Sequence, residues 1–173
     1  MELILLKNKK SNCIIIIMRC IVMKFGIDIN KNEFKNIIFE ICDILNITKV
    51  KISYDVSKFR SETMMAQVDV EKRIIYLKRF NIITPDIFFV IFHELRHLWQ
   101  YDHNKELFIL SYKEVNEFDN VNDYNLQLAE IDANAFAGLM IMDLFGLKPL
   151  YKGLSEKVKN KIYERIEVIK KEF

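Results

Sequence analysis

Two histidines four positions apart, with a glutamate beside the first, are the residues of this chain best suited to chemistry. They lie in the sequence His93-Glu94-Leu95-Arg96-His97, an H-E-x-x-H pattern within a segment of helical periodicity. On a helix such histidines point about 40° apart and lie about 6 Å apart along the axis, so both imidazoles can reach one metal ion. Glu94 is placed to contact a metal-bound water rather than the metal. Zinc held by two imidazoles and one further ligand, with a position open to water, is a hydrolytic centre, and this is the chemistry that the pattern predicts.

Two residues compete to be the third zinc ligand. His103 would complete the spacing of the metzincin proteases, which have a glycine three residues after the second histidine, where this chain has Gln100. Without that glycine the helix is expected to continue, and His103 then lies about 240° around and about 9 Å along from His97. His103 is therefore the weaker alternative, and Glu130 is the preferred ligand.

Glu130 lies in a second predicted helix whose sequence is suited to close helix packing. Ala133, Ala137 and Gly138 add almost no side-chain bulk, which would let this helix approach the first one closely enough for a carboxylate to reach the metal. Asn134 shares a helix face with Glu130 and is expected to orient a ligand histidine through its second ring nitrogen.

The two motifs together resemble those of the ImmA/IrrE-type metallopeptidases. These are small gluzincins in which H-E-x-x-H is followed by E-x-x-A-N-x-F-A, a pattern that residues 130–137 match as Glu-Ile-Asp-Ala-Asn-Ala-Phe-Ala. The likeness covers about residues 24–150, and it includes the order of helix, small sheet and two further helices. Members of the family cut repressor proteins, so the resemblance implies a protein substrate.

The resemblance also implies roles for particular residues. His93, His97 and Glu130 would bind zinc, and Glu94 would be the general base. Arg96 departs from the pattern, because the family commonly has glycine at that position.

The predicted function is that of a zinc-dependent endopeptidase, which hydrolyses peptide bonds of a protein partner through a metal-activated water. Two neutral imidazoles and one carboxylate leave zinc with a net positive charge, which lowers the pKa of its water. A donor to the oxyanion is also expected, and Tyr101, Tyr112 and Tyr124 are the candidates. The alternative is a non-catalytic, zinc-stabilised regulatory or binding protein of the same fold. An intact Glu94 favours the enzyme, because a structural zinc site needs no base.

Helices are predicted to carry both motifs. Residues 84–86, Thr-Pro-Asp, are typical of a helix N-terminus, and the helix with the H-E-x-x-H pattern is expected to end near Tyr101. Residues 104–122 are polar and irregular, which indicates a long loop or a short helix over the site. A second helix is predicted over residues 125–145, and a C-terminal amphipathic helix follows Ser155.

The N-terminal half is predicted to supply one helix and a small sheet. Asn30 and Glu33 resemble a helix capping pair. Short strands are predicted at residues 50–56, 66–70 and 73–77, the last two as a hairpin. The expected fold class is therefore α+β, with a small mixed or antiparallel sheet packed on the H-E-x-x-H helix and the helix that bears Glu130.

Length and composition predict one globular domain. The chain has 173 residues, of which 51% are hydrophobic, and its net charge of +2 comes from 26 basic and 24 acidic residues that are well interspersed. This distribution does not indicate a nucleic-acid partner. The domain is expected to span residues 23–173, preceded by a non-essential extension at residues 1–22.

The extension is not expected to anchor the protein in a membrane. Its apolar run, residues 13–23, is far shorter than the roughly 20 residues of a spanning helix. Cys13, Cys20 and Cys42 are an odd number without C-x-x-C spacing, so neither a disulfide framework nor a cysteine zinc site is predicted. The cytoplasm is the expected location.

Overall fold

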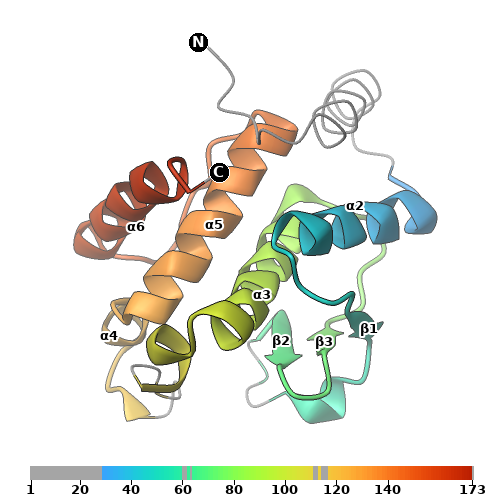
Figure 1. The fold of residues 1–173 in the computed structure, drawn as a ribbon, viewed down its shortest axis with the longest axis horizontal. Helices are drawn as coiled ribbons and strands as arrows, with labels where there is room; N and C mark the ends of the chain where they lie inside the picture. Colours follow the sequence, from blue (N-terminus) through green and yellow to red (C-terminus); the bar gives the residue numbers. More distant parts are fainter. Residues whose placement is uncertain (1–28, 60–61, 63, 111–112, 114–116, 173) are drawn as a thin grey trace.

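The computed structural model has an α+β architecture, in which several helices pack beside a small three-stranded mixed sheet (Figure 1). The expected fold class is confirmed at this level. The predicted N-terminal extension, residues 1–22, lies outside the described part of the chain. The described residues are 29–59, 62, 64–110, 113 and 117–172.

The first described helix begins at the predicted capping pair. Helix α2 (Lys31–Ile44) is preceded by Asn30, whose side chain accepts hydrogen bonds from the backbone N–H groups of Asn32 and Glu33. The Glu33 carboxylate in turn accepts a hydrogen bond from the backbone N–H of Asn30, over 2.9 Å. This reciprocal arrangement satisfies backbone donors that a helix N-terminus otherwise leaves unpaired.

The sheet contains β1 (Lys51–Ser53), β2 (Ala66–Asp69) and β3 (Ile74–Leu77) in the order β1-β3-β2. Strands β2 and β3 pair antiparallel, as the predicted hairpin requires, while β1 lies parallel to β3. Strand β2 is therefore an edge strand, and it is the strand that contacts helix α3 (Pro85–His103).

The strand predicted at residues 50–56 is shorter than expected. The side chain of Asp55 accepts hydrogen bonds from the backbone N–H and the hydroxyl of Ser57, over 3.1 Å and 2.7 Å. This local pairing starts the 3₁₀-helix η1 (Val56–Lys58) and takes the chain out of the sheet.

Three long helices form the rest of the fold. Helices α3 and α5 (Leu128–Phe145) lie side by side and run in opposite directions, and α6 (Glu156–Ile169) packs on α5 (Figure 1). Between α3 and α5 the chain forms the π-helix η2 (Glu106–Leu110) and the short helix α4 (Val121–Asn125). The predicted loop or short helix at residues 104–122 thus contains two short helical segments.

The second predicted helix begins a few residues after its expected start at about residue 125. Asn120 caps α4 by accepting hydrogen bonds from the backbone N–H groups of Asn122 and Asp123, so a separate helix forms first. Helix α5 then begins at Leu128 and ends at Gly146, which has a left-handed backbone with φ of 66°. Glycine adopts this conformation without strain, as the helix stop requires.

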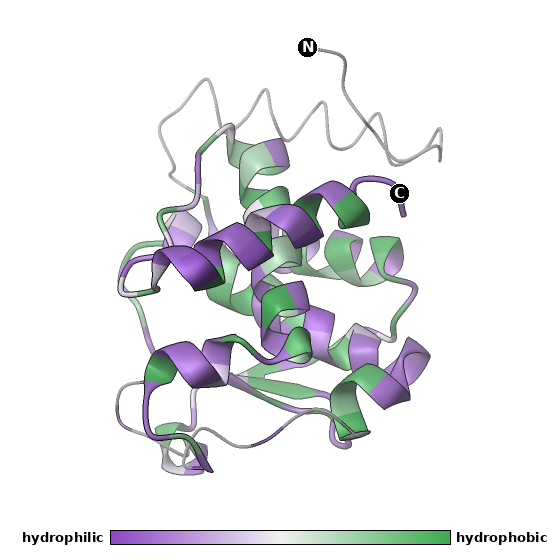
Figure 2. Ribbon diagram, turned by 90° about the vertical axis from the view of Figure 1, so that its left-hand side faces the viewer, coloured by the Kyte–Doolittle hydropathy of each residue, from purple (hydrophilic) through white to green (hydrophobic). Residues whose placement is uncertain are grey.

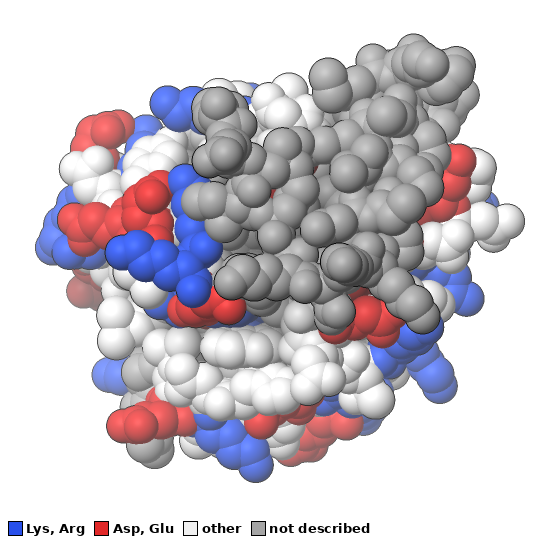
Figure 3. Space-filling view, turned by 45° about the horizontal axis from the view of Figure 1, so that its top comes forward, with Lys and Arg blue, Asp and Glu red and all other residues white. Residues whose placement is uncertain are grey.

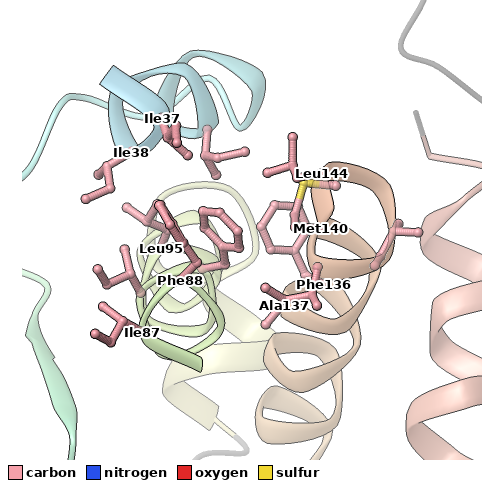
Figure 4. Close-up of a cluster of buried hydrophobic side chains, with 14 of the residues drawn as sticks. Ile37, Ile38, Ile87, Phe88, Leu95, Phe136, Ala137, Met140 and Leu144 are labelled. Atoms are coloured by element: carbon pink, nitrogen blue, oxygen red, sulfur yellow. The ribbon is translucent and has the colours of Figure 1, made fainter. Parts of the chain in front are cut away.

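The hydrophobic core includes the junction of α2, α3 and α5, and it continues to buried side chains of β3 and α6. Side chains from all three helices interdigitate there, and each fully buried Leu, Ile, Phe or Met side chain contributes about 1.5–3 kcal/mol through removal from water (Figure 4). Those labelled in the figure are Ile37, Ile38, Ile87, Phe88, Leu95, Phe136, Ala137, Met140 and Leu144. Helix α5 is buried along most of its length, whereas α6 turns a hydrophilic face outward (Figure 2).

On the face drawn in Figure 3, basic and acidic side chains are interspersed over the described part, without a continuous basic stripe. Among the described residues, none of the helices combines the length and the apolar character that crossing a membrane requires.

The small residues of α5 do not all face α3. Ala137 lies in the core between the two helices, as expected (Figure 4). Gly138 instead faces the segment that follows α5, where a Cβ atom would overlap the hydroxyl of Tyr151 and lie 3.2 Å from Cγ of Pro149. Gly138 thus permits a close approach to Tyr151 rather than to α3.

Replacing Gly138→Ala should lower the free energy of unfolding, because overpacking costs about 1–3 kcal/mol and exceeds the gain of about 1 kcal/mol in helix propensity. The loss of unfolding free energy, measured by urea unfolding, should be smaller when the substitution is made in a Tyr151→Phe background, which lacks the obstructing hydroxyl. Equal losses in both backgrounds would contradict this packing.

Candidate metal centre

His93, His97 and Glu130 come together at one point between α3 and α5. The Nε2 atoms of the two histidines are 3.0 Å apart, and Glu130 presents Oε2 to His93 and Oε1 to His97, each over 3.3 Å. Both predicted histidines and the preferred third residue therefore form one group that could hold a metal ion.

The three side chains lie close enough together to bind one metal ion. Ligand atoms about 2.0–2.1 Å from zinc in a tetrahedron lie about 3.3–3.4 Å from one another. The two Nε2 atoms are 3.0 Å apart, and each lies 3.3 Å from a different oxygen of Glu130, so a small rotation of the carboxylate would bring one oxygen to this spacing from both. Two imidazole nitrogens that face each other and a carboxylate also repel one another unless a cation or a proton lies between them. The donor set therefore fits zinc.

The positions of the three side chains follow from their helices. His93 and His97 are one helical turn apart on α3, so their rings share a face. Glu130 lies in the first turn of α5, where the helix dipole favours a negative charge, and only 1% of its surface is exposed. Its Oε1 also accepts a 2.6 Å hydrogen bond from the hydroxyl of Tyr124 in α4.

His103 is not part of this group. Helix α3 continues through Gln100 to His103, two residues beyond its predicted end at Tyr101. The His103 Nε2 lies 3.1 Å from the backbone oxygen of Asn46, and the ring is tilted by 35° to that of Trp99 at a centroid distance of 6.0 Å. The expectation that an unbroken helix carries His103 away from the site is confirmed.

Asn134 does not orient a ligand histidine, which corrects the sequence prediction. Its amide donates a 3.2 Å hydrogen bond to Oδ1 of Asn125, at the end of α4. The partner of His97 is Gln100, whose Oε1 lies 2.8 Å from Nδ1 of the ring. The signal for Gln100 was available in the sequence, since a residue three positions after His97 shares its helix face.

A buried ion pair lies behind the three metal-binding candidates. Arg96 is fully buried, and its Nε donates a 2.7 Å hydrogen bond to Oδ2 of Asp132, while its Nη2 lies 3.0 Å from Oδ1. Arg165 of α6 donates to the same Oδ1 over 2.7 Å. Burial opposes the charge on Asp132, but hydrogen bonds and charge from the two arginines hold its pKa below the usual range. Arg96, which stands where the ImmA/IrrE-type metallopeptidases commonly have glycine, is thus paired with Asp132.

Glu94 lies beside the metal-binding candidates, on the wall of a cleft of about 490 Å³. Burial raises the pKa of its carboxyl group, although the neighbouring His93 and His97 act in the opposite direction. Strand β2 forms another wall of the cleft, and Phe108 of η2 contacts the ring of His97 at a centroid distance of 5.7 Å.

The three tyrosine candidates are separated by the structure. Tyr124 lines the cleft and donates to Glu130. Tyr101 packs against Phe108 and is not among the described residues that line the cleft. Tyr112 lies outside the described part of the chain.

The chain matches no protein-family model, and it has no significant match among curated proteins or solved structures. The resemblance to the ImmA/IrrE-type metallopeptidases therefore stays a prediction from the two motifs. The chemistry of the site is inferred from its own residues and their geometry.

Glu130→Ala should weaken zinc binding by more than the roughly 10–100-fold that is typical for loss of an outer partner, because it removes one of three protein ligands. His103→Ala should change zinc affinity by no more than a few-fold. Competition with a chelator measures both. The opposite ranking would assign the third position to His103 and leave α5 with a purely structural role.

Metal binding should also depend on pH. In the metal-free site burial lowers the pKa of His97, but the charge and hydrogen bond of Glu130 outweigh it and raise the pKa to about 9. At pH 7 His97 is then protonated, and a metal ion must displace that proton.

Calorimetry in buffers of different ionisation enthalpy should therefore detect release of about one proton per zinc at pH 7, and affinity should rise about tenfold per pH unit up to pH 9. The His103→Ala variant should release the same number of protons as the wild type when it binds zinc. An affinity that does not change between pH 7 and pH 9 would show that the proton on His97 does not compete with the metal.

Proposed function

We propose that the protein is a zinc-dependent endopeptidase that hydrolyses peptide bonds of a protein partner. The observation that carries the proposal is the convergence of two imidazoles and one buried carboxylate, with Glu94 beside them on the wall of a cleft. A purely structural zinc site is usually closed by four protein ligands, whereas three ligands beside a cleft leave a position for water.

The residues of the chain divide the chemistry between them. Zinc bound by His93, His97 and Glu130 would polarise the peptide carbonyl and acidify a bound water. Glu94 accepts the proton of the attacking water and returns it to the leaving amine, for which a carboxyl pKa raised by burial is suited. The Tyr124 hydroxyl, which already lies at the cleft, is the proposed donor to the oxyanion.

The cleft favours an extended peptide as the substrate. Its walls include residues 66–70, which contain the whole of edge strand β2. An edge strand can pair with an added strand through backbone hydrogen bonds, largely independent of side-chain sequence. A peptide held in this way would place its backbone carbonyl groups along the cleft that Glu94 and both histidines line.

The partner is proposed to be a regulatory protein such as a repressor. This follows from the resemblance of the two motifs to the ImmA/IrrE-type metallopeptidases, whose substrates are of this kind. The cytoplasm is the proposed location, in agreement with Cys42, which is a buried free thiol rather than part of a disulfide.

Glu94→Gln tests the proposal most simply. The amide cannot accept a proton from water, while His93, His97 and Glu130 are untouched. The variant should therefore bind zinc as the wild type does and lose hydrolysis of any peptide in a library that the wild type cleaves, by about 100-fold or more.

Glu71→Gln is the matched control, since it makes the same change at another acidic residue of the cleft. It should retain activity. Equal activity of Glu94→Gln and wild type would exclude Glu94 as the base. A wild type that binds zinc and gains stability but cleaves nothing would favour the zinc-stabilised binding protein instead.

A further inference from the structure

The side chain of Gln100 connects His97 to helix α5. It is fully buried, and its amide has partners on both sides. Oε1 lies 2.8 Å from Nδ1 of His97, and Nε2 donates to the backbone oxygen of Ala129 over 2.9 Å and to Oδ2 of Asp132 over 2.8 Å.

The partners allow only one orientation of this amide. The carbonyl of Ala129 can only accept hydrogen bonds, and so can the carboxylate of Asp132 while it is paired with arginine. The NH₂ group of Gln100 must therefore point toward α5. Reversing the amide would place its oxygen against two other oxygens, which repel it, and would lose both hydrogen bonds from Gln100 to α5.

The orientation of Gln100 determines which nitrogen of His97 carries a hydrogen. Since Oε1 of Gln100 is an acceptor only, Nδ1 of His97 must be the donor. In the neutral ring, the lone pair then resides on Nε2, which is the atom that faces His93 and Glu130. This is the tautomer that a metal ion requires at that place.

Asp132 is itself held in position by charged partners. Arg96 binds it through two hydrogen bonds, and the Arg96 guanidinium is fixed in turn by the ring of Trp99, whose centroid lies 3.7 Å from Cζ. Arg165 reaches Oδ1 from α6. A bidentate pair has little rotational freedom, so the oxygen that receives the amide of Gln100 has a fixed place.

We infer that Gln100 is a positioning residue that sets the tautomer and ring orientation of His97, and that Arg96 and Asp132 set the orientation of Gln100. The inference rests on the metal-binding part of the proposed function and not on hydrolysis. It assigns Arg96, which stands where the ImmA/IrrE-type metallopeptidases commonly have glycine, a place in the metal site through Asp132.

The experiment compares Gln100→Met with Arg165→Met in the full chain. Methionine has the length of glutamine but no acceptor for the ring, whereas Arg165→Met removes a partner of Asp132 that contacts neither Gln100 nor His97 in the hydrogen bonds described above. Zinc affinity is measured by chelator competition. Proton-detected ¹⁵N spectra of the histidine rings in the zinc-loaded protein report whether His97 Nδ1–H is protected from exchange with water.

Gln100→Met should bind one zinc with about 10–100-fold lower affinity and lose the protected Nδ1–H signal. Arg165→Met should retain that signal and keep its zinc affinity within about threefold of the wild type, even if its melting temperature falls, because Arg96 still holds Asp132. Equal losses of affinity in the two variants would overturn the inference, since the network would then only hold the helices together.

The wild type alone provides a second test that does not depend on the folding of a variant. His97 Nδ1–H should exchange with water much more slowly than the ring N–H of the exposed His103, and similar rates would also overturn the inference. A wild type without zinc affinity would contradict the metal centre as well. A wild type that binds zinc with a protected Nδ1–H but cleaves no peptide would contradict only the peptidase.

Discussion

The buried carboxylate of Glu130 between two imidazoles is the constraint on which the rest of the structure depends. An ionised carboxylate that is 1% exposed is strongly destabilising unless positive charge compensates it. His93 and His97 supply that charge when they share a proton or a metal ion with it. The compensation works only if α3 and α5 stay at a fixed separation and rotation. The core beside α2 and the small side chain of Ala137 provide the packing that keeps them there.

The two faces of the α3–α5 contact have complementary roles. One face presents His93 and His97 to the cleft beside the buried Glu130, and the other pairs Arg96 with Asp132 inside the protein. A buried ion pair contributes little net stability, because the desolvation of both charges offsets their attraction. It does fix the register of the two helices, since a shift by one residue would break both hydrogen bonds between Arg96 and Asp132. Gln100 lies where the two faces meet.

The sequence predicted the parts of the site that depend on local geometry. The spacing of His93 and His97 fixes their shared helix face, and the lack of a helix-breaking residue at Gln100 was sufficient to place His103 elsewhere. The prediction of Glu130 required the second motif as well as helical spacing, because this residue approaches the histidines from another helix. The partner of His97 was missed although Gln100 shares its helix face, because the position of Asn134 relative to the ring depends on the rotation of α5 about its axis. The sequence pattern around the helix does not determine that rotation.

X-ray absorption at the zinc edge tests the central claim most directly, because it reports the atoms around the metal without assuming any activity. The zinc-loaded protein should show a shell of four light atoms at about 2.0–2.1 Å, with imidazole scattering from two histidines and oxygen from one carboxylate and one water. Scattering from sulfur at about 2.3 Å, or from three imidazoles, would contradict the assignment of His93, His97 and Glu130 as the metal ligands.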